Sequence, residues 1–396
     1  MIRPSRRTAQ FHYAIRNIVS AAEELEREGR EVIYLNIGDP QVYGFRPPGH
    51  VTETVARALR DKFTGYAHSS GLPEARQSVA DYASALGSRT TPSDVLITSG
   101  ASEAADLVLT ALLEEGEEVL LPAPGYPLYS AILNKLGAAA RYYELDARLG
   151  WLPTPEEVES LINERTRALV LINPNNPTGS VTPDETTKKL LDVAARRGLL
   201  VIADEVYREL CFDKAPTPAS TLAEGSDVAL ITLESLSKTH MVPGWRVGWM
   251  RFTNAARMTE LIQAIHRLAS GRLCSPTPAQ YAVRPALEGD RSFLDDFMRD
   301  IRKRRDYVAD NAMSAIGQLS CETPKAAFYA MIKVRDPEGR TDERFVLDLL
   351  RETGVLVVHG SGFGADPSQC YFRLVYLPEL RILETVFERF LNFLQS

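Results

Sequence analysis

The chain has 396 residues, of which 44% are hydrophobic, and its 45 basic and 52 acidic residues give a formal charge of −7. This length is enough for about two to three domains with a large core. The acidic balance argues against nucleic acid as a main partner, because a phosphate polymer is bound by a basic surface. No stretch reaches about 18 uninterrupted apolar residues, so the sequence predicts no membrane span and no membrane partner.

Cysteine usage and the N-terminal sequence indicate the compartment. The four cysteines lie far apart and form no CxxC pair, which predicts neither a metal site nor a disulfide framework. Reduced thiols are typical of a cytoplasmic protein. Polar residues such as Gln10, His12 and Asn17 interrupt the N-terminal sequence, which therefore does not resemble a signal peptide. We expect a cytoplasmic protein.

The elements follow a clear order along the chain. The N-terminal segment has one helical stretch, near 17–29, and we expect it to cross to a smaller domain. From about residue 90 to 252, short β-rich runs alternate with longer helical patterns. The runs are 95–98, 119–121, 169–172, 199–202, 229–232 and 247–250. Several are apolar on both faces, as strands of a mainly parallel sheet covered by helices must be, which predicts a large α/β domain over residues 46–285.

Two helix starts in this domain have a recognisable pattern. Thr154-Pro155-Glu156-Glu157 and Thr182-Pro183-Asp184-Glu185 each place a threonine before a proline and a glutamate. This is the pattern of a capping box with proline at the first helical position. We expect a capped helix to begin at each proline.

The C-terminal part of the chain has a different pattern. Helical stretches near 291–316, 341–353 and 379–395 alternate with short β-type segments. These segments lie near 328–334, 355–358 and 371–376. Residues 1–45 and 286–396 are therefore expected to form a smaller α+β domain.

Four polar segments lie at or just beyond the ends of predicted strands. They are 173–179 (NPNNPTG), 204–207 (DEVY), 235–238 (SLSK) and 244–248 (GWRVG). Because the carboxyl ends of parallel strands face the ligand crevice of an open sheet, these segments can converge on one site. Each alone has an ordinary structural explanation, such as a helix cap, an exposed lysine or a turn. Their joint occurrence at strand ends favours a functional site.

With these segments the chain resembles the fold type I, class I/II aminotransferases, which depend on pyridoxal 5′-phosphate (PLP). The segments 36–40 (NIGDP) and 372–374 (FRL) fit the same pattern, so the resemblance covers nearly the full length. The segments 13–16 (YAIR), 122–128 (PAPGYPL) and 273–280 (LCSPTPAQ) resemble bacterial and archaeal alanine aminotransferases in particular. The resemblance implies a PLP-binding α/β domain, a smaller α+β domain and a homodimer with shared active sites.

The resemblance assigns the chemistry to a few side chains around the cofactor ring. Lys238 would hold PLP as a Schiff base and later shuttle a proton, because a primary amine can act first as a nucleophile and then as a base. Asp204 would pair with the pyridine nitrogen and favour its protonated form. Tyr207 and Asn176 would donate to the phenolate oxygen, and Tyr126 would stack on the ring.

The phosphate contacts follow from the same resemblance. The backbone N–H groups of Ala101 and Ser102, at a predicted helix start, would hold the dianion together with the Ser102 hydroxyl. Ser235 and Arg246 would complete this cup, the arginine as a bidentate partner. Tyr66 would reach the phosphate of the other subunit, which makes the dimer a functional requirement.

The resemblance also assigns the substrate contacts. Arg373 would bind the α-carboxylate, since a planar guanidinium suits a carboxylate. Asn176 and the Gly38 backbone would contact the same group, and Tyr13 would lie at the mouth of the site. The expected reaction is a ping-pong transfer of an amino group from an L-amino acid, alanine, to a 2-oxo acid, 2-oxoglutarate.

Some questions stay open from the sequence. The side-chain carboxylate of glutamate could be held by Arg272, by Arg16, or by hydroxyls such as those of Tyr13 and Tyr129. An aromatic or broad-specificity aminotransferase and a PLP-dependent C–S β-lyase are alternatives. A PLP-binding transcription regulator would need a DNA-binding domain, and the roughly 35 residues before Gly38 are too few for one of typical size.

Overall fold

A computed structural model of the protein describes residues 2–3, 5, 18–314 and 318–395. Its centre is a seven-stranded sheet in the order β2-β8-β7-β6-β5-β3-β4. The strands are β2 (Val95–Thr98), β3 (Glu118–Ala123), β4 (Ala139–Glu144), β5 (Thr166–Ile172), β6 (Leu200–Asp204), β7 (Ala229–Ser235) and β8 (Gly248–Thr253). Strand β8 is antiparallel to β2 and β7, and the other neighbouring pairs are parallel. The sheet is therefore mainly parallel, as predicted.

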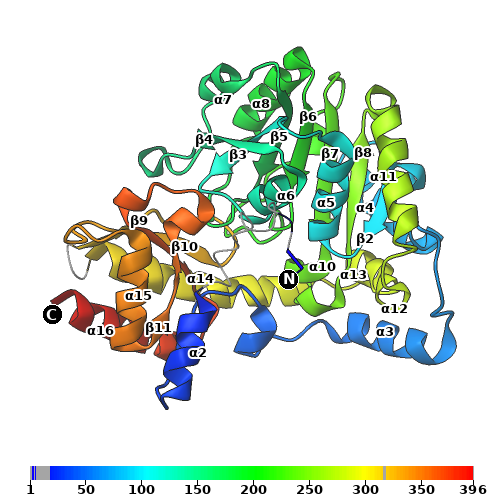
Figure 1. Ribbon diagram of the computed structural model, residues 1–396. Helices are drawn as coiled ribbons and strands as arrows, with labels where there is room; N and C mark the ends of the chain where they lie inside the picture. The colour runs from blue at the N-terminus through cyan, green and yellow to red at the C-terminus, as the bar shows by residue number, and fades with distance from the viewer. Residues whose placement is uncertain (1, 4, 6–17, 315–317, 396) are drawn as a thin grey trace.

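Helices cover both faces of this sheet (Figure 1). They are α5 (Ala101–Leu112), α6 (Leu128–Leu136), α7 (Pro155–Leu161), α8 (Asp184–Arg197), α9 (Ala219–Leu222) and α11 (Thr259–Gly271). Helices α5, α6 and α11 share one core with the strands, and α7 and α8 share another. Along β5, Val170 belongs to the first core, whereas Leu169 and Leu171 belong to the second. This alternation explains why the central strands are apolar on both faces.

A second, smaller sheet lies beside the first (Figure 1). It is antiparallel, in the order β12-β13-β10-β9. Its strands and helices are β9 (Leu319–Cys321), β10 (Tyr329–Val334), β12 (Val358–His359), β13 (Tyr371–Val375), α14 (Ser292–Ser314), α15 (Asp342–Thr353) and α16 (Leu380–Gln395). The N-terminal helix α2 (Val19–Arg27) shares their core, and β1 (Ile33–Tyr34) pairs in parallel with β11 (Val355–Leu356). The domain boundaries at 45/46 and 285/286 stay a prediction.

The remaining helices pack near the β2 edge of the large sheet. They are α3 (Gly49–Asp61), α4 (Pro73–Ala85), α10 (Leu236–Thr239), α12 (Thr277–Gln280) and α13 (Val283–Glu288). Short 3-10 turns are η2 (Pro40–Tyr43), η3 (Pro92–Asp94), η4 (Ala147–Leu149), η5 (Pro243–Trp245), η6 (Ala255–Arg257), η7 (Gly360–Phe363) and η8 (Pro367–Gln369). The core at this edge includes Val95, Ile97 and Trp249.

The sequence did not predict strand β4, and its place at the edge of the sheet explains why. Among its six residues only Tyr143 is buried. An edge strand with so much exposed surface lacks the continuous apolar run by which the inner strands were identified. The parallel pairing with β3, from Glu118 to Ala123, supplies its hydrogen bonds instead.

The two predicted capping boxes are wrong. Helix α7 does begin at Pro155, but α8 begins at Asp184, and no capping bond from the Thr154 or Thr182 side chain is found among the described residues. The Thr182 backbone is instead tied to the Asn173 side chain by two hydrogen bonds of 3.0 and 3.1 Å. These bonds fix the chain just after the 173–179 segment.

Two glycines let strand β8 pass close to the start of α5. A Cβ on Gly248 would lie 2.7 Å from the Ala101 backbone nitrogen. Gly100 has φ +79°, and a Cβ there would lie 2.6 Å from the Arg246 guanidinium. The neighbours of Gly248 are backbone atoms, which cannot rotate aside as a side chain can. The start of α5, Gly248 and Arg246 are therefore packed as one unit.

We predict that Gly248→Ala lowers the free energy of unfolding by about 1–3 kcal/mol, because its methyl group overlaps the backbone at the start of α5. Gly244→Ala is the matched control, since nothing lies within 4 Å of a Cβ at that position. Its effect should stay within about 0.5 kcal/mol. Chemical denaturation of both variants measures the difference. Equal free energies of unfolding for the two variants would show that β8 and α5 can move apart without loss of stability.

Candidate active site

Polar side chains gather where the strands of the large sheet end. The parallel strands β5, β6 and β7 end at Ile172, Asp204 and Ser235, and the last two of these residues are polar. A cavity of about 190 Å³ lies at this edge. Eleven of the residues singled out from the sequence line it: Gly38, Ala101, Ser102, Tyr126, Asn176, Asp204, Tyr207, Ser235, Lys238, Arg246 and Arg373. The segments predicted to converge do lie together, and the roles of their residues stay a prediction.

Lys238 lies in the short helix α10, directly after strand β7. Its Nζ donates to the backbone carbonyl of Gly38 at 2.6 Å. Burial lowers the pKa of Lys238 to about 8, and the positive charges of Arg373 and Arg246 act in the same direction. Asp39 opposes this shift. The amine is therefore far more often neutral at physiological pH than that of an exposed lysine.

Asp204 is the last residue of β6, and its carboxylate is buried. Tyr129 donates its hydroxyl proton to Asp204 Oδ2 at 2.8 Å, and the Val206 N–H donates to Oδ1 at 3.3 Å. Burial raises the pKa of Asp204, whereas both hydrogen bonds lower it. The hydroxyl of Tyr129, which was one candidate to bind the side-chain carboxylate of a substrate, is thus hydrogen-bonded to Asp204.

Tyr207 has a partner that the sequence analysis missed. Its hydroxyl lies 2.8 Å from that of Tyr329, which also lines the cavity. Burial, above all, raises the pKa of Tyr207 well above that of a free phenol. Tyr329 stands in strand β10, where a single tyrosine in a β-type segment gave no sign of anything but core packing.

Arg373, on strand β13, is 1% exposed. Its Nη1 donates to Asn176 Oδ1 at 3.1 Å, and its Nη2 donates to the Asn36 carbonyl. The guanidinium lies over the rings of Tyr329 and Phe363, at 4.6 Å from each centroid. Because arginine can only donate, the Asn176 atom that faces it must be the amide oxygen, which leaves the Asn176 NH₂ group to donate elsewhere.

The start of helix α5 forms one wall of the cavity. Ala101 and Ser102 are its first residues and line the cavity together with Ser235. Arg246 lies beside them and donates to the Ser99 carbonyl at 3.1 Å. Unpaired N–H groups at a helix start, next to a guanidinium and hydroxyls, are suited to bind a phosphate group.

Tyr66 does not line this cavity. Tyr66 is 78% exposed and lies on the surface. Tyr13 and Arg16 lie outside the described residues. The sequence-based expectations for these residues therefore remain without a contact to support them.

Arg272, one candidate for a second carboxylate clamp, pairs with a residue of its own chain. Its Nε lies 2.8 Å from Glu103 Oε1, and its Nη2 donates to the Ile97 carbonyl at 3.0 Å. The other Glu103 oxygen accepts from the Ser99 N–H at 2.7 Å. The Arg272 charge is therefore used to brace the start of α5.

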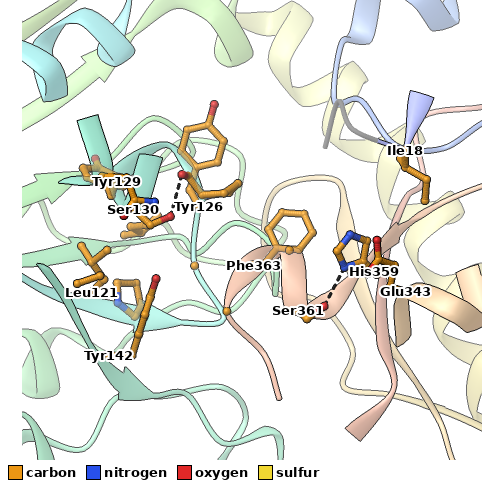
Figure 2. Close-up of a pocket in the computed structure, with 18 of the residues that line it drawn as sticks. Ile18, Leu121, Tyr126, Tyr129, Ser130, Tyr142, Glu343, His359, Ser361 and Phe363 are labelled. Carbon is orange, nitrogen blue, oxygen red and sulfur yellow. Dashed lines mark hydrogen bonds between the residues drawn. The ribbon is translucent and has the colours of Figure 1, made fainter. Parts of the chain in front are cut away.

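A larger cavity of about 630 Å³ adjoins the first at Tyr126 and Ile172. Figure 2 shows it between Tyr126, Ser130 and Tyr142 of the large sheet and its helices, and Glu343, His359 and Phe363 of the smaller sheet and its helices. His359 Nδ1 lies 2.8 Å from the Ser361 hydroxyl. The first cavity thus continues into a wider space between the two halves of the molecule.

Other kinds of site are not seen in the described ranges. No group of three or more His, Cys, Asp or Glu side chains is placed there to hold a metal ion. No described helix is both long and apolar enough to cross a bilayer. The four cysteines form no disulfide.

Known proteins resemble the chain over nearly its full length. A family profile for aminotransferase class I and II matches residues 30–385. The chain is 36% identical to the glutamate-pyruvate aminotransferase AlaA of Haemophilus influenzae, over 97% of this chain and 96% of that protein. It is 38% identical to the alanine aminotransferase of Mycobacterium tuberculosis strain H37Rv, over 97% and 90% of the two chains.

Solved structures agree with this result. The alanine aminotransferase from Pyrococcus furiosus has a TM-score of 0.96 and 37% identity, over 99% of this chain and 100% of that one. The expected family and the expected fold type I, an α/β domain with a helix-covered, mainly parallel sheet, are thereby confirmed. The chain belongs to the class I and II aminotransferases, a family of PLP-dependent enzymes.

Proposed function

We propose that the chain is a PLP-dependent alanine aminotransferase that moves an amino group between L-alanine and a 2-oxo acid, 2-oxoglutarate. One observation carries the proposal: the Lys238 amine, the Asp204 carboxylate and the Arg373 guanidinium line a single cavity. The reaction needs a nucleophilic amine, an anionic partner for the ring nitrogen and a carboxylate clamp. The names of the relatives, at 36 and 38% identity, support the choice of substrates.

The cavity fits the phosphate of PLP. The N–H groups of Ala101 and Ser102 at the helix start, the Ser235 hydroxyl and the Arg246 guanidinium would hold it. Gly100 supports this fit, since a Cβ there would press on the Arg246 guanidinium. The donors in this group are cationic or neutral, as a dianion requires.

Other residues that line the cavity fit the ring of PLP. Asp204 would pair with the ring nitrogen, and Tyr126 would stack on the ring. Tyr207 and the NH₂ group of Asn176, whose amide oxygen faces Arg373, would donate to the phenolate oxygen. Lys238 would form the covalent attachment through its amine.

The mechanism depends on the protonation states of the chain's own groups. Lys238, with its pKa lowered to about 8, supplies a neutral amine for attack. When released, the same amine would take the proton from the substrate α-carbon and pass it to C4′ of the cofactor. Bound PLP supplies the electron-withdrawing ring that stabilises the charge left on that carbon. Asp204, held by Tyr129, favours the protonated ring nitrogen.

The substrate preference follows from where positive charge is available. Arg373 would bind the α-carboxylate, with Asn176 and the Gly38 backbone beside it. Arg272 is already paired with Glu103, which removes it as a clamp for a second carboxylate. A small apolar side chain therefore suits the described part of the site better than the short, charged side chain of aspartate. The longer side chain of 2-oxoglutarate would have to reach another group, such as Arg16 or the Tyr13 hydroxyl.

We also infer a homodimer with shared active sites, in the cytoplasm. Tyr66 is 78% exposed, and it lies near other exposed apolar residues in sequence, such as Leu59 and Phe63. A partner subunit that covers these residues would bring Tyr66 to its own phosphate site. Four free cysteines support a reducing compartment.

The pKa of Lys238 gives a pH-dependent prediction. An amine reacts when neutral, so the rate of covalent PLP attachment to the apoenzyme should rise with pH and level off above about 8. An ordinary lysine would give a midpoint near about 10.4. Stopped-flow absorbance measures the rate, and Lys238→Ala is the control that should show no attachment.

Borohydride reduction and peptide mapping should place the cofactor on Lys238, and a label on another lysine would contradict the assignment.

The dimer is tested by mixing two defective variants. Lys238→Ala chains lack the amine, and Tyr66→Phe chains lack the hydroxyl proposed to act on the partner. A mixed dimer has one site with both groups intact, so equal mixing should restore about a quarter of wild-type activity. The control mixes Lys238→Ala/Tyr66→Phe chains with Tyr66→Phe chains. No mixed dimer then has a site with both groups intact, so no activity should be restored. No recovery despite proven subunit exchange would rule out action across the interface.

Substrate preference is tested by steady-state kinetics. We predict that kcat/KM for alanine exceeds that for aspartate by at least about tenfold, because the distal carboxylate of aspartate would be desolvated without a partner. Asparagine, similar in size and neutral, separates the effect of charge from that of volume. A kcat/KM for aspartate equal to that for alanine would overturn the proposed substrate. The highest kcat/KM for tyrosine would favour an aromatic aminotransferase.

A further inference from the structure

Tyr329 connects the groups proposed for cofactor and substrate, and none of the roles given above uses it. It is 2% exposed, and its hydroxyl lies 2.8 Å from that of Tyr207. Its ring faces the Arg373 guanidinium at 4.6 Å. A Cβ on Gly38 would lie only 2.1 Å from the Tyr329 hydroxyl oxygen, so this hydroxyl rests directly against the Gly38 backbone. One side chain thus contacts three residues of the proposed site.

The hydrogen bond between the two phenols has a direction. Tyr207 has one hydroxyl proton, and if that proton is donated to the phenolate oxygen of PLP, Tyr207 can only accept from Tyr329. A donor that itself accepts a hydrogen bond is a stronger donor, because such bonds polarise one another. Tyr329 would therefore both orient the Tyr207 proton and strengthen its bond.

The ring of Tyr329 acts on a different group. The Arg373 guanidinium lies over the rings of Tyr329 and Phe363, at 4.6 Å from each centroid. A guanidinium in contact with two aromatic rings is held in its orientation, and its donors keep their directions. This contact does not need the Tyr329 hydroxyl, so the two effects can be separated by substitution.

We propose that Tyr329 is a positioning residue with two separable functions. Its hydroxyl donates to Tyr207 and thereby directs the Tyr207 proton to the phenolate oxygen of the cofactor. Its ring holds the Arg373 guanidinium in the orientation that binds the substrate α-carboxylate. This inference rests on the proposed function.

Tyr329→Phe removes the hydroxyl and keeps the ring. In the substrate-free holoenzyme, the pH midpoint of the bound PLP absorbance should rise by roughly 0.1 to 0.6 pH unit, because the Tyr207 bond that favours the unprotonated cofactor weakens. The KM for alanine should stay within about twofold, since the ring contact is kept. A fall in the midpoint would mean that Tyr207 donates to Tyr329, which overturns the hydroxyl function.

Two further variants test whether the shift passes through Tyr207. Tyr207→Phe should raise the midpoint more, and the double variant Tyr207→Phe/Tyr329→Phe should match it, because the second hydroxyl then has nothing to act on. Tyr376→Phe is the matched control: this tyrosine is also fully buried, and its hydroxyl donates to the Ala327 carbonyl at 3.2 Å. It should leave the midpoint unchanged. Additive shifts in the double variant would overturn the proposed path.

Tyr329→Leu removes the ring as well. The KM for alanine should then rise roughly threefold to tenfold, the range expected for the loss of one cation–π contact. Phe363→Leu removes the other ring that contacts the guanidinium, so it should raise KM similarly while leaving the absorbance midpoint in place. An unchanged KM in both variants, with native circular dichroism, would overturn the ring function.

The same measurements separate this inference from the proposed function. A wild-type protein that fails to bind PLP, or a Tyr207→Phe variant with an unchanged midpoint, overturns the proposed site and this inference with it. If the wild type and Tyr207→Phe behave as expected but Tyr329→Phe has the wild-type midpoint, only the role of Tyr329 is wrong.

Discussion

The arrangement of the molecule depends on the hydrogen bonds of the buried Arg373 guanidinium. It stands on strand β13 of the smaller sheet, yet its donors go to Asn176, after strand β5 of the large sheet, and to Asn36 in the N-terminal segment. An arginine buried without such partners would cost several kcal/mol. Three distant segments must therefore be in place together for this charge to be tolerated, and the cavity is complete only when they are.

Burial in the same cavity also sets the pKa values of Lys238 and Asp204. It lowers the pKa of Lys238 and raises the pKa of Asp204, so that it favours the neutral form of each. Hydrogen bonds to Asp204 from Tyr129 and Val206 work against this effect and favour the carboxylate. The cavity thus combines a readily neutral amine with a carboxyl group whose pKa burial raises, while two hydrogen bonds oppose that rise.

The sequence predicted the parts of the fold and of the candidate site that depend on local patterns. Inner strands were visible as apolar runs, and the segments containing Asp204 and Lys238 were visible because they follow such strands. Strand β4 was missed because an edge strand has no such run. Tyr129 and Tyr329 were not identified as partners of Asp204 and Tyr207, because those contacts join residues 75 and 122 positions apart and depend on packing alone.

The bond between Asn36 and Arg373 spans 337 positions, and the short pair β1–β11 closes the same loop. Contacts of such high contact order form slowly, since a long loop must close before they contribute. At a synthesis rate of about 5–20 residues per second, the N-terminal segment waits roughly 20 to 70 s for its partner to be made. During this interval helix α2, with Ala22 and Leu25, lacks most of the core that it joins, because the greater part of that core lies from Phe297 onward. The N-terminal end of a nascent chain therefore keeps apolar side chains such as Leu25 without most of their partners until the C-terminal segment is made.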